Sequence, residues 1–460
     1  MRFLFTCVPG LGHFNPAVPL ARALEQAGHS VAFVTAPRFA EAVKKAGFEC
    51  LTAGLDWDER RIVETVPDIA KVESIFHGWW IMGHLFLDRS PRQMVPDLLT
   101  KIIPQWRPDM IISGSFEYGG PLAAEKAGLP YATVNYTIRW SRWILKHMLR
   151  GSMKALRKEV GLPADPQLKA FGRYLDLWFS PPSWTYQGVF LRPVLTRQVR
   201  ARILGPDLPL RERWWGFRLL LLQLVFTHHL RKHPNEAVPA PNTHFIREDD
   251  CRTEKGPPPE WLQAMPRQPT VFISLGTVLS ARYPDIFAKI LEGMRDQPVN
   301  LVITLGGNDD PDRFGPQPPN VRIVRFMTQD ELRELFPHVD LCINHAGYSS
   351  VMEALTRGIP LILLPLVTDA PMNTQMCQAD GIAADLPPQL FGLNTEGLPI
   401  LKPDRLTPAI LRDTIMRALT DPSYRTAAHA MQDTLSARPG PDVAVAMLEQ
   451  IARAGAGGAR

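Results

Sequence analysis

The chain has 460 residues and a formal net charge of +5; 45% of its residues are hydrophobic and 21% are charged. This length allows two or three domains, and the composition is that of an ordinary soluble protein. The small charge does not by itself indicate nucleic-acid binding, and the longest apolar stretch, residues 219–226, is far too short to span a bilayer.

The five cysteines are scattered along the chain without a C-x-x-C pair. We therefore expect reduced thiols rather than a disulfide framework or a zinc site. The first apolar run ends in a glycine turn, as a strand does, so we expect no signal peptide and a cytoplasmic protein.

The first 37 residues predict a β–α–β unit. The apolar run Phe3–Phe5 is typical of a buried parallel strand. Asn15, followed by proline, predicts the N-cap of a helix that ends at Gly28, and Val31–Val34 predicts the second strand.

His13 lies just before this predicted cap, where ligands gather at the carboxyl ends of parallel strands. The positive end of the helix disfavours a charged imidazole, so we expect a neutral ring that acts as a general base. The alternative is a turn histidine without chemistry. A nicotinamide or flavin enzyme is a weaker alternative, because the third glycine of G-x-G-x-x-G is Asn15 and no acidic residue ends the second strand.

Strands and helices alternate through the first half and again from residue 270. The stretch between these halves is rich in Arg, Trp and Pro and its periodicity is mostly helical. We expect an α/β protein with two Rossmann-like, doubly wound domains that face each other across a cleft. The expected divisions are an N-terminal domain at 1–238 with a variable helical region at about 139–230, a linker at 239–268, a C-terminal domain at 269–430, and a C-terminal helix and tail at 431–460.

Residues 341–355 predict a strand, a turn of small residues and the start of a helix. The N–H groups of Gly347, Ser349 and Ser350 would form an anion site at the positive end of that helix, and His345 can add a donor. A diphosphate is the natural occupant. The alternative is an ordinary helix capped by serine.

Two further segments of the second half can contribute to this site. Gly276 and Thr277 form a glycine turn after the first strand and could approach the same phosphates. Asp369 follows another strand, where a carboxylate can accept hydrogen bonds from sugar hydroxyls. The alternative for Asp369 is a loop residue that caps the next helix.

Together these segments resemble the inverting, UDP-sugar or dTDP-sugar dependent glycosyltransferases of family 1, which have the two-domain GT-B fold. The chain is most similar to bacterial natural-product glycosyltransferases. The resemblance covers most of the chain outside residues 139–230, and the matching segments are 12–16, 107–112, 116–124, 274–277 and 321–369.

The resemblance implies that His13 deprotonates an acceptor hydroxyl, which then attacks and inverts the anomeric carbon. The 347–350 turn and His345 would stabilise the departing diphosphate, so the enzyme would need no metal and no cofactor beyond the nucleotide-sugar co-substrate. Asp309 and Asp310 are interpreted as solvated loop residues rather than as a metal pair.

The resemblance also assigns the rest of the donor site. Phe326 would stack on the nucleobase and Gln329 would hydrogen-bond the base or ribose. Glu353 would bind the ribose hydroxyls, with a solvent-facing helix residue as the alternative, and Asp369 would bind the sugar.

Four positions depart from the family pattern. Many relatives have an aspartate that orients the catalytic histidine where this chain has Gly114; Glu117 could reach the imidazole instead. Ala370 replaces a frequent glutamine beside the sugar-binding aspartate, so one hydrogen bond to the sugar is missing and the identity of the donor sugar is not predicted. Ala346 replaces a usual glycine and Thr328 a usual proline.

Acceptor selectivity is expected in the loops of the first half. Basic and aromatic side chains alternate over 139–150 and 211–232; they could line a pocket for a lipophilic acceptor or rest on a membrane surface. The alternative is amphipathic helices that pack on the core. The predicted acceptor-pocket residues are Phe76, Trp79, Trp80 and Tyr136.

We therefore predict an inverting enzyme that moves a hexose or deoxyhexose from a UDP- or dTDP-sugar to a hydroxyl of a hydrophobic small molecule. Its partners would be these two substrates, with no nucleic acid and with peripheral membrane contact as an option. The alternatives are a nucleotide-sugar epimerase of the same architecture and a catalytically silent helper protein.

Overall fold

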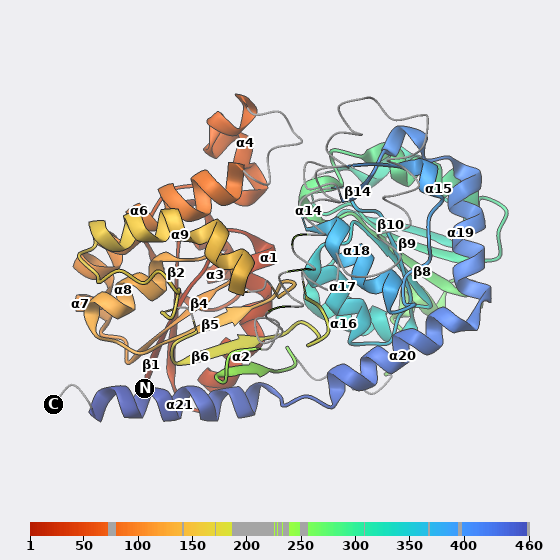
Figure 1. The fold of residues 1–460 in the computed structure, drawn as a ribbon. Coiled ribbons are helices and arrows are strands. Elements are labelled where there is room, and N and C mark those ends of the chain that lie inside the picture. Colours follow the sequence, from red (N-terminus) through yellow and green to blue (C-terminus); the bar gives the residue numbers. More distant parts are fainter. Residues whose placement is uncertain are drawn as a thin grey trace. The chain divides into compact units, whose positions relative to one another are not determined.

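The structure, a computed structural model, describes residues 1–71, 80–139, 142–170, 172–185, 225, 228, 232, 239–248, 256–307, 309–366, 369–393 and 398–457. It divides into two compact units (Figure 1). Unit 1 comprises Met1–Gln187, His228–Asp249 and Arg438–Arg460, and unit 2 comprises Gly188–Thr227 and Asp250–Ala437.

Unit 1 is built on a seven-stranded parallel sheet in the order β3-β2-β1-β4-β5-β6-β7. The strands are β1 (Arg2–Thr6), β2 (Ser30–Thr35), β3 (Glu49–Thr52), β4 (Met110–Gly114), β5 (Tyr131–Asn135), β6 (Leu175–Trp178) and β7 (Thr243–Phe245). The order reverses between β1 and β4, and loops at such a switch point are where open α/β sheets bind ligands.

Helices cover both faces of this sheet. Figure 1 shows α2 and α21 along one side of it and α6 and α9 on the other. The helical segments of unit 1 are α1 (Leu11–Phe14), α2 (Val18–Gln26), α3 (Ala40–Lys45), α4 (Ile62–Thr65), a π-helix (Ile81–Arg89), α6 (Ser90–Asp97), a second π-helix (Leu98–Ile102), α7 (Ile103–Trp106), α8 (Gly119–Ala127), α9 (Arg142–Glu159), α21 (Pro441–Gly457), and 3₁₀ turns at Asn15–Ala17, Pro37–Phe39, Glu59–Arg61 and Pro67–Lys71.

The C-terminal helix α21 packs on α2 although it follows unit 2 in the chain. Its apolar residues Ala444 and Leu448 are buried. Glu449 forms a hydrogen bond with His29, which follows α2, with Oε1 2.7 Å from Nε2. The last segment of the chain is therefore part of the core of unit 1.

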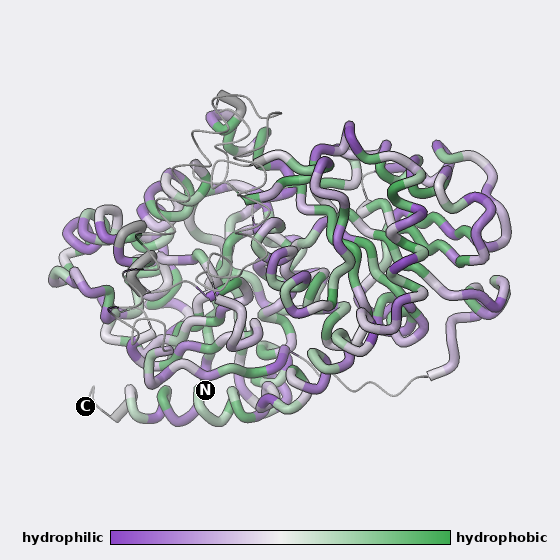
Figure 2. The backbone as a smooth tube through the Cα atoms, turned by 45° about the vertical axis from the view of Figure 1, so that its right-hand side comes forward, coloured by the Kyte–Doolittle hydropathy of each residue, from purple (hydrophilic) through white to green (hydrophobic). Residues whose placement is uncertain are grey.

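Unit 2 is built on a five-stranded parallel sheet in the order β10-β9-β8-β11-β12, with a switch point between β8 and β11. Its central strands are buried, and Figure 2 shows them as hydrophobic segments. The strands are β8 (Thr270–Ser274), β9 (Asn300–Thr304), β10 (Val321–Val324), β11 (Leu341–Asn344), β12 (Leu361–Leu363) and a separate antiparallel pair, β13 (Phe391–Leu393) and β14 (Pro399–Leu401).

The helical segments of unit 2 precede, connect and follow these strands. They are α13 (Glu260–Gln263), α14 (Gly276–Leu279), α15 (Pro284–Met294), α16 (Gln329–Leu335), α17 (Tyr348–Leu355), α18 (Ala370–Ala379), α19 (Pro408–Thr420), α20 (Pro422–Ser436), and 3₁₀ turns at Pro311–Phe314, Phe336–His338, Pro388–Leu390 and Pro403–Arg405. The two parallel sheets confirm the predicted fold class of two Rossmann-like α/β domains.

Three local features differ from the sequence-based expectations. The prediction that Asn15 caps the first helix is wrong: α1 begins at Leu11, after an extended Gly10, so Asn15 starts a 3₁₀ turn and its side chain makes no capping bond. Prolines are tolerated in the first turn of a helix, so α1, the turn and α2 follow one another without a break. Strands β6 and β7 were not predicted, because three or four residues carry too little periodicity to distinguish a strand from a loop.

Candidate active site

His13 lies in α1, and the turn of residues 7–10 connects β1 to this helix. The backbone N–H groups of His13 and Phe14 donate to the carbonyl of Gly10, at 3.1 and 3.0 Å. A Cβ atom on residue 10 would collide with the carboxylate of Glu59, whose backbone N–H donates to the carbonyl of Pro9 at 2.9 Å. Glycine at position 10 thus lets an acidic loop residue lie against this turn. Glu59 was not predicted as a site residue, since no sequence signal connects it to residue 13.

Three aromatic rings surround the half-buried imidazole of His13. Its ring centroid is 6.1 Å from that of Phe86 and 6.0 Å from those of Phe116 and Tyr136, all in edge-on orientations. Phe86 and Phe116 also stack on each other, with centroids 5.7 Å apart. These contacts restrict the imidazole laterally and make its surroundings apolar. Phe86 and Phe116 were missed in the sequence because they come from distant segments.

Tyr136 follows β5, and its side chain is 4% exposed. Its backbone N–H donates to the Ser115 hydroxyl at 3.1 Å. Its phenol oxygen is buried and has no hydrogen-bond partner among the described residues. Burial raises the pKa of Tyr136 well above the usual value, so the phenol is neutral and available as a hydrogen-bond donor.

Glu117 is buried between β4 and α8. Its carboxylate accepts hydrogen bonds from the Thr6 hydroxyl at 2.5 Å and from the N–H groups of Gly119 and Gly120, both at 2.8 Å. Burial raises the pKa of Glu117, and these three donors act in the opposite direction. Its hydrogen bonds with the described residues therefore stabilise the start of α8, and its contact with His13 stays a prediction.

In unit 2, the imidazole of His345 brings together the two glycine turns of the predicted phosphate site. A Cβ atom on Gly276 would lie 2.7 Å from its Cε1 atom, and one on Gly347 would lie 2.5 Å from its Nε2 atom. Only glycine at both positions leaves room for the ring. Burial lowers the pKa of His345 to about 4, so the imidazole is neutral near pH 7.

Gly347 precedes α17 in an extended conformation and provides no side-chain cap. The first N–H groups of a helix have no partner within it, so those at the start of α17 can bind an anion. Ser349 and Ser350 lie in this first turn and are half-buried. Thr277 lies in α14, which begins at Gly276. Gly276 and Gly347 therefore lie against His345, and the other predicted diphosphate residues follow these two glycines in α14 and α17.

The other predicted donor residues lie on neighbouring loops and helices of unit 2. Phe326 follows β10, is 52% exposed, and lies over Gly307, on which a Cβ atom would be 3.8 Å from its ring. Gln329 is the exposed first residue of α16. Glu353 lies in α17, where its Oε1 atom is 2.8 Å from Nη1 of Arg357.

Asp369 is the residue before α18, but its carboxylate makes no capping bond to that helix. Instead it accepts a hydrogen bond from the side-chain amide of Asn373 at 3.0 Å. The side chain of Asp369 therefore does not cap α18, which was the alternative prediction for this residue.

The predicted acceptor residues are only partly described. Phe76 and Trp79 lie outside the described residues. Trp80 is half-buried and stacks on His84, with ring centroids 5.3 Å apart. Tyr136 contacts His13, with ring centroids 6.0 Å apart.

Neither a metal site nor a membrane span was found in the part of the chain that the structure describes. It contains no group of three or more His, Cys, Asp and Glu side chains that could hold a metal ion. None of its helices is long and apolar enough to cross a membrane.

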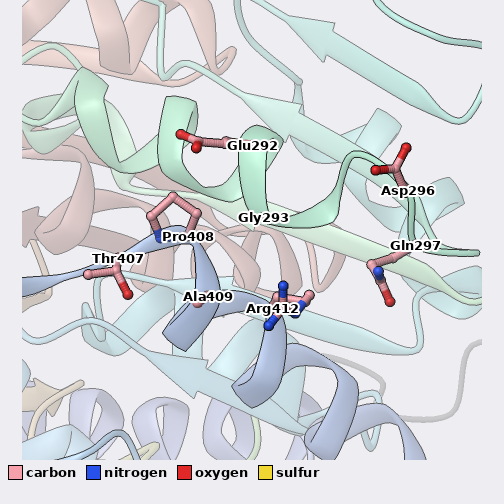
Figure 3. Close-up of a pocket in the computed structure, with 8 residues that line it drawn as sticks. All are labelled: Glu292, Gly293, Asp296, Gln297, Thr407, Pro408, Ala409 and Arg412. Carbon is pink, nitrogen blue, oxygen red and sulfur yellow. The ribbon is translucent and has the colours of Figure 1, made fainter.

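A groove of about 390 Å³ lies between the end of α15 and the start of α19 (Figure 3). Its lining is polar and contains none of the predicted site residues. Gly293 packs against the backbone of Pro408 there, which makes this a junction between two helices. We assign no function to it.

Comparison with known proteins gives matches to two family descriptions. Residues 221–392 match UDP-glucoronosyl and UDP-glucosyl transferase, and residues 22–181 match the erythromycin biosynthesis protein CIII-like N-terminal domain. The chain is 25% identical over 468 residues to demethyllactenocin mycarosyltransferase of Streptomyces fradiae, covering 97% of this chain and 86% of that protein. It is 24% identical over 489 residues to 10-deoxymethynolide desosaminyltransferase of Streptomyces venezuelae, covering 98% and 97%.

Solved structures of similar fold include the calicheamicin glycosyltransferase CalG4, with a TM-score of 0.67, 20% identity and 98% of both chains covered. Glycosyltransferase VinC in complex with dTDP gives a TM-score of 0.65 at 20% identity, with 99% of this chain and 100% of that chain covered.

Proposed function

We propose that the chain is a nucleotide-sugar dependent glycosyltransferase of the GT-B fold, which moves a hexose or deoxyhexose from a UDP- or dTDP-sugar to a hydroxyl of a hydrophobic small molecule. One observation carries the proposal most directly. A neutral imidazole, His345, lies between two glycine turns at the start of α17, which is an arrangement suited to a diphosphate.

On the donor side, the amides at the start of α17 would bind the diphosphate together with His345. These fixed dipoles would stabilise the negative charge that develops on the leaving group, so no divalent cation is required. Phe326 would stack on the base, Gln329 and Glu353 would bind the base and ribose, and Asp369 would bind sugar hydroxyls. The exposed ring of Phe326 supports this assignment, because a solvent-facing phenylalanine gains stability when a flat ligand covers it.

On the acceptor side, His13 would take the proton of the attacking hydroxyl, which would invert the anomeric carbon. The rings of Phe86, Phe116 and Tyr136 around His13 support an apolar acceptor. The two relatives described above are named as transferases of mycarosyl and desosaminyl groups, and the VinC structure contains dTDP. These names favour a deoxyhexose and dTDP for this chain.

Contact with a membrane surface is a weaker part of the proposal. In α9, the apolar residues Leu149, Met153 and Leu156 are buried in the core of unit 1. This packing supports the alternative of an amphipathic helix with a basic outer face.

The test is transfer to a library of apolar alcohols from a panel of UDP- and dTDP-sugars, read by mass spectrometry and by NMR of the anomeric configuration. We expect an inverted glycoside as product. His13→Ala should lower kcat by about 10²–10⁴-fold, the usual contribution of a general base, while dTDP still binds. Conversion of a nucleotide-sugar without acceptor would instead favour an epimerase, and nucleotide binding without turnover would favour a silent helper.

A further inference from the structure

Ala346, between His345 and Gly347, has a backbone conformation that alanine rarely adopts. Its φ angle is 63°, in the left-handed region, where a Cβ atom crowds the following carbonyl at a cost of roughly 1–2 kcal/mol. The residue is fully buried. This strained residue sets the direction in which the chain enters the start of α17, so something must hold it in place.

Two buried side-chain amides hold the peptide groups of Ala346. Its N–H donates to Oδ1 of Asn344 at 2.8 Å, and its carbonyl accepts from Nδ2 of Asn373 at 2.8 Å. Asn344 and Asn373 are 0% and 1% exposed, so water does not compete for these bonds. The bond from Asn373 is the long-range one, because it joins the turn to α18.

The same nitrogen of Asn373 makes a second hydrogen bond. Nδ2 donates to Oδ2 of Asp369 at 3.0 Å, one helical turn earlier, at the residue before α18. An amide nitrogen carries two hydrogens, so both bonds form at once. Because a carbonyl and a carboxylate both face this nitrogen, only the donor end of the amide fits there.

We infer that Asn373 is a positioning residue that fixes the phosphate-binding turn and the sugar-binding carboxylate relative to each other. This inference rests on the proposed function, in which that turn binds the diphosphate and Asp369 binds the sugar. The side chain of Asn373 then fixes the positions of both the diphosphate subsite and the sugar subsite. Its removal should weaken the binding of a free nucleoside diphosphate, although Asn373 is not expected to touch that ligand.

The experiment is calorimetric titration of the full-length chain with dTDP, UDP, dTDP-glucose and UDP-glucose. In Asn373→Leu, which removes both donated bonds, we expect binding of the free diphosphates to weaken about tenfold, the equivalent of releasing the strain at Ala346. Binding of the sugar nucleotides should weaken more than binding of the free diphosphates, because Asp369 also loses its hydrogen bond from Asn373. Asp369→Asn should weaken the binding of the sugar nucleotides only and leave the binding of the free diphosphates unchanged.

Thr374→Val is the matched control. Thr374 lies next to Asn373 in α18, is 3% exposed, and its hydroxyl donates only within the helix, to the carbonyl of Ala370 at 2.9 Å. The affinity of the Thr374→Val variant for all four nucleotides should stay within twofold of that of the wild type. Adding Ala346→Gly to Asn373→Leu should restore diphosphate binding, because glycine adopts this φ angle without strain, but should not restore the contribution of the sugar.

Asn373→Asp is the second variant, in case the leucine variant does not fold, and the same losses are expected. The inference is overturned if a folded Asn373 variant binds dTDP and UDP like the wild type, if Thr374→Val loses as much, or if the added glycine restores nothing. A wild-type chain that binds none of the four nucleotides would overturn the proposed function itself, and the inference with it.

Discussion

The phenol oxygen of Tyr136 occupies the space that a Cβ atom of residue 114 would fill, so Gly114 and Tyr136 are complementary. Position 114 is where, by resemblance, many relatives have the aspartate that orients the catalytic histidine. In this chain a buried hydroxyl lies there instead, on a ring whose centroid is 6.0 Å from that of His13.

Gly114→Ala should therefore displace Tyr136 and disturb the surroundings of His13. We expect kcat/KM to fall at least tenfold in steady-state assays, with dTDP binding unchanged, because the clash is confined to unit 1. Gly151→Ala is the control, since a Cβ atom there meets nothing within 4 Å. Adding Tyr136→Phe to Gly114→Ala removes the clashing oxygen; if activity does not recover, the complementarity is not the cause.

Gly276→Ala should weaken dTDP binding by at least tenfold in a titration. The added Cβ atom would lie 2.7 Å from the His345 ring and would be strained at a φ angle of 74°. Gly315 separates the two effects, because its φ angle is 67° but a Cβ atom there meets nothing within 4 Å. Gly315→Ala should lose stability by a comparable 1–2 kcal/mol, roughly, while dTDP binding stays normal. Equal binding losses in both variants would mean that strain, and not the His345 contact, is responsible.

Stability should fall in acid partly through His345. Its pKa in the folded chain is about 4, below the usual value of 6.5 for histidine, so the unfolded chain binds more protons between these values. The contribution is fully present above pH 6.5 and is lost as the pH falls towards 4. Urea unfolding at pH 7 and pH 4.5 measures the loss, which should be smaller in His345→Asn because asparagine does not titrate. An equal loss in both proteins would contradict a His345 imidazole that stays neutral in the folded chain.

Glu117→Gln should destabilise the chain by about 1–2 kcal/mol in urea unfolding, because an amide cannot accept all the bonds that the carboxylate accepts at the start of α8. The pH profile of kcat/KM tests the separate prediction that Glu117 stabilises the protonated form of His13. If it does, the acidic limb shifts in the variant; if it only caps the helix, the limb stays in place.

Transfer should continue in EDTA. In the proposed mechanism, backbone dipoles and His345 stabilise the leaving diphosphate without a cation. Rates measured with EDTA and with added Mg²⁺ should agree within about twofold. A strict demand for Mg²⁺ in the chemical step would contradict this account of the leaving group.

The sequence predicts the sheet-and-helix framework well because long apolar strands and glycine turns are local signals. The strand at 341–344 and the small-residue turn after it were recognisable for this reason, as was the position of His13 after the first strand. The misassigned cap at Asn15 reflects a local ambiguity: Gly10 and Asn15 both suit a helix start, and only the folded chain selects one.

The contacts of the site were less predictable. Phe86, Phe116 and Glu59 meet His13 or its turn through tertiary folding, and no spacing in the sequence joins them. Asn373 was not singled out in the sequence, and its contact with Asp369 one helical turn earlier came from the structure. Its bond to Ala346 depends on how α18 packs against the turn, and this is not visible in the sequence.

The return of the last segment to unit 1 has a consequence for biosynthesis. Helix α21 supplies buried residues to the first unit, but the ribosome makes it after the whole of the second. The first unit therefore cannot complete its core during translation, and a chain stopped at the end of unit 2 would leave the surface of α2 beneath α21 uncovered. Unit 1 expressed without α21 should aggregate. A circularly permuted form in which α21 is joined to unit 1 should not aggregate.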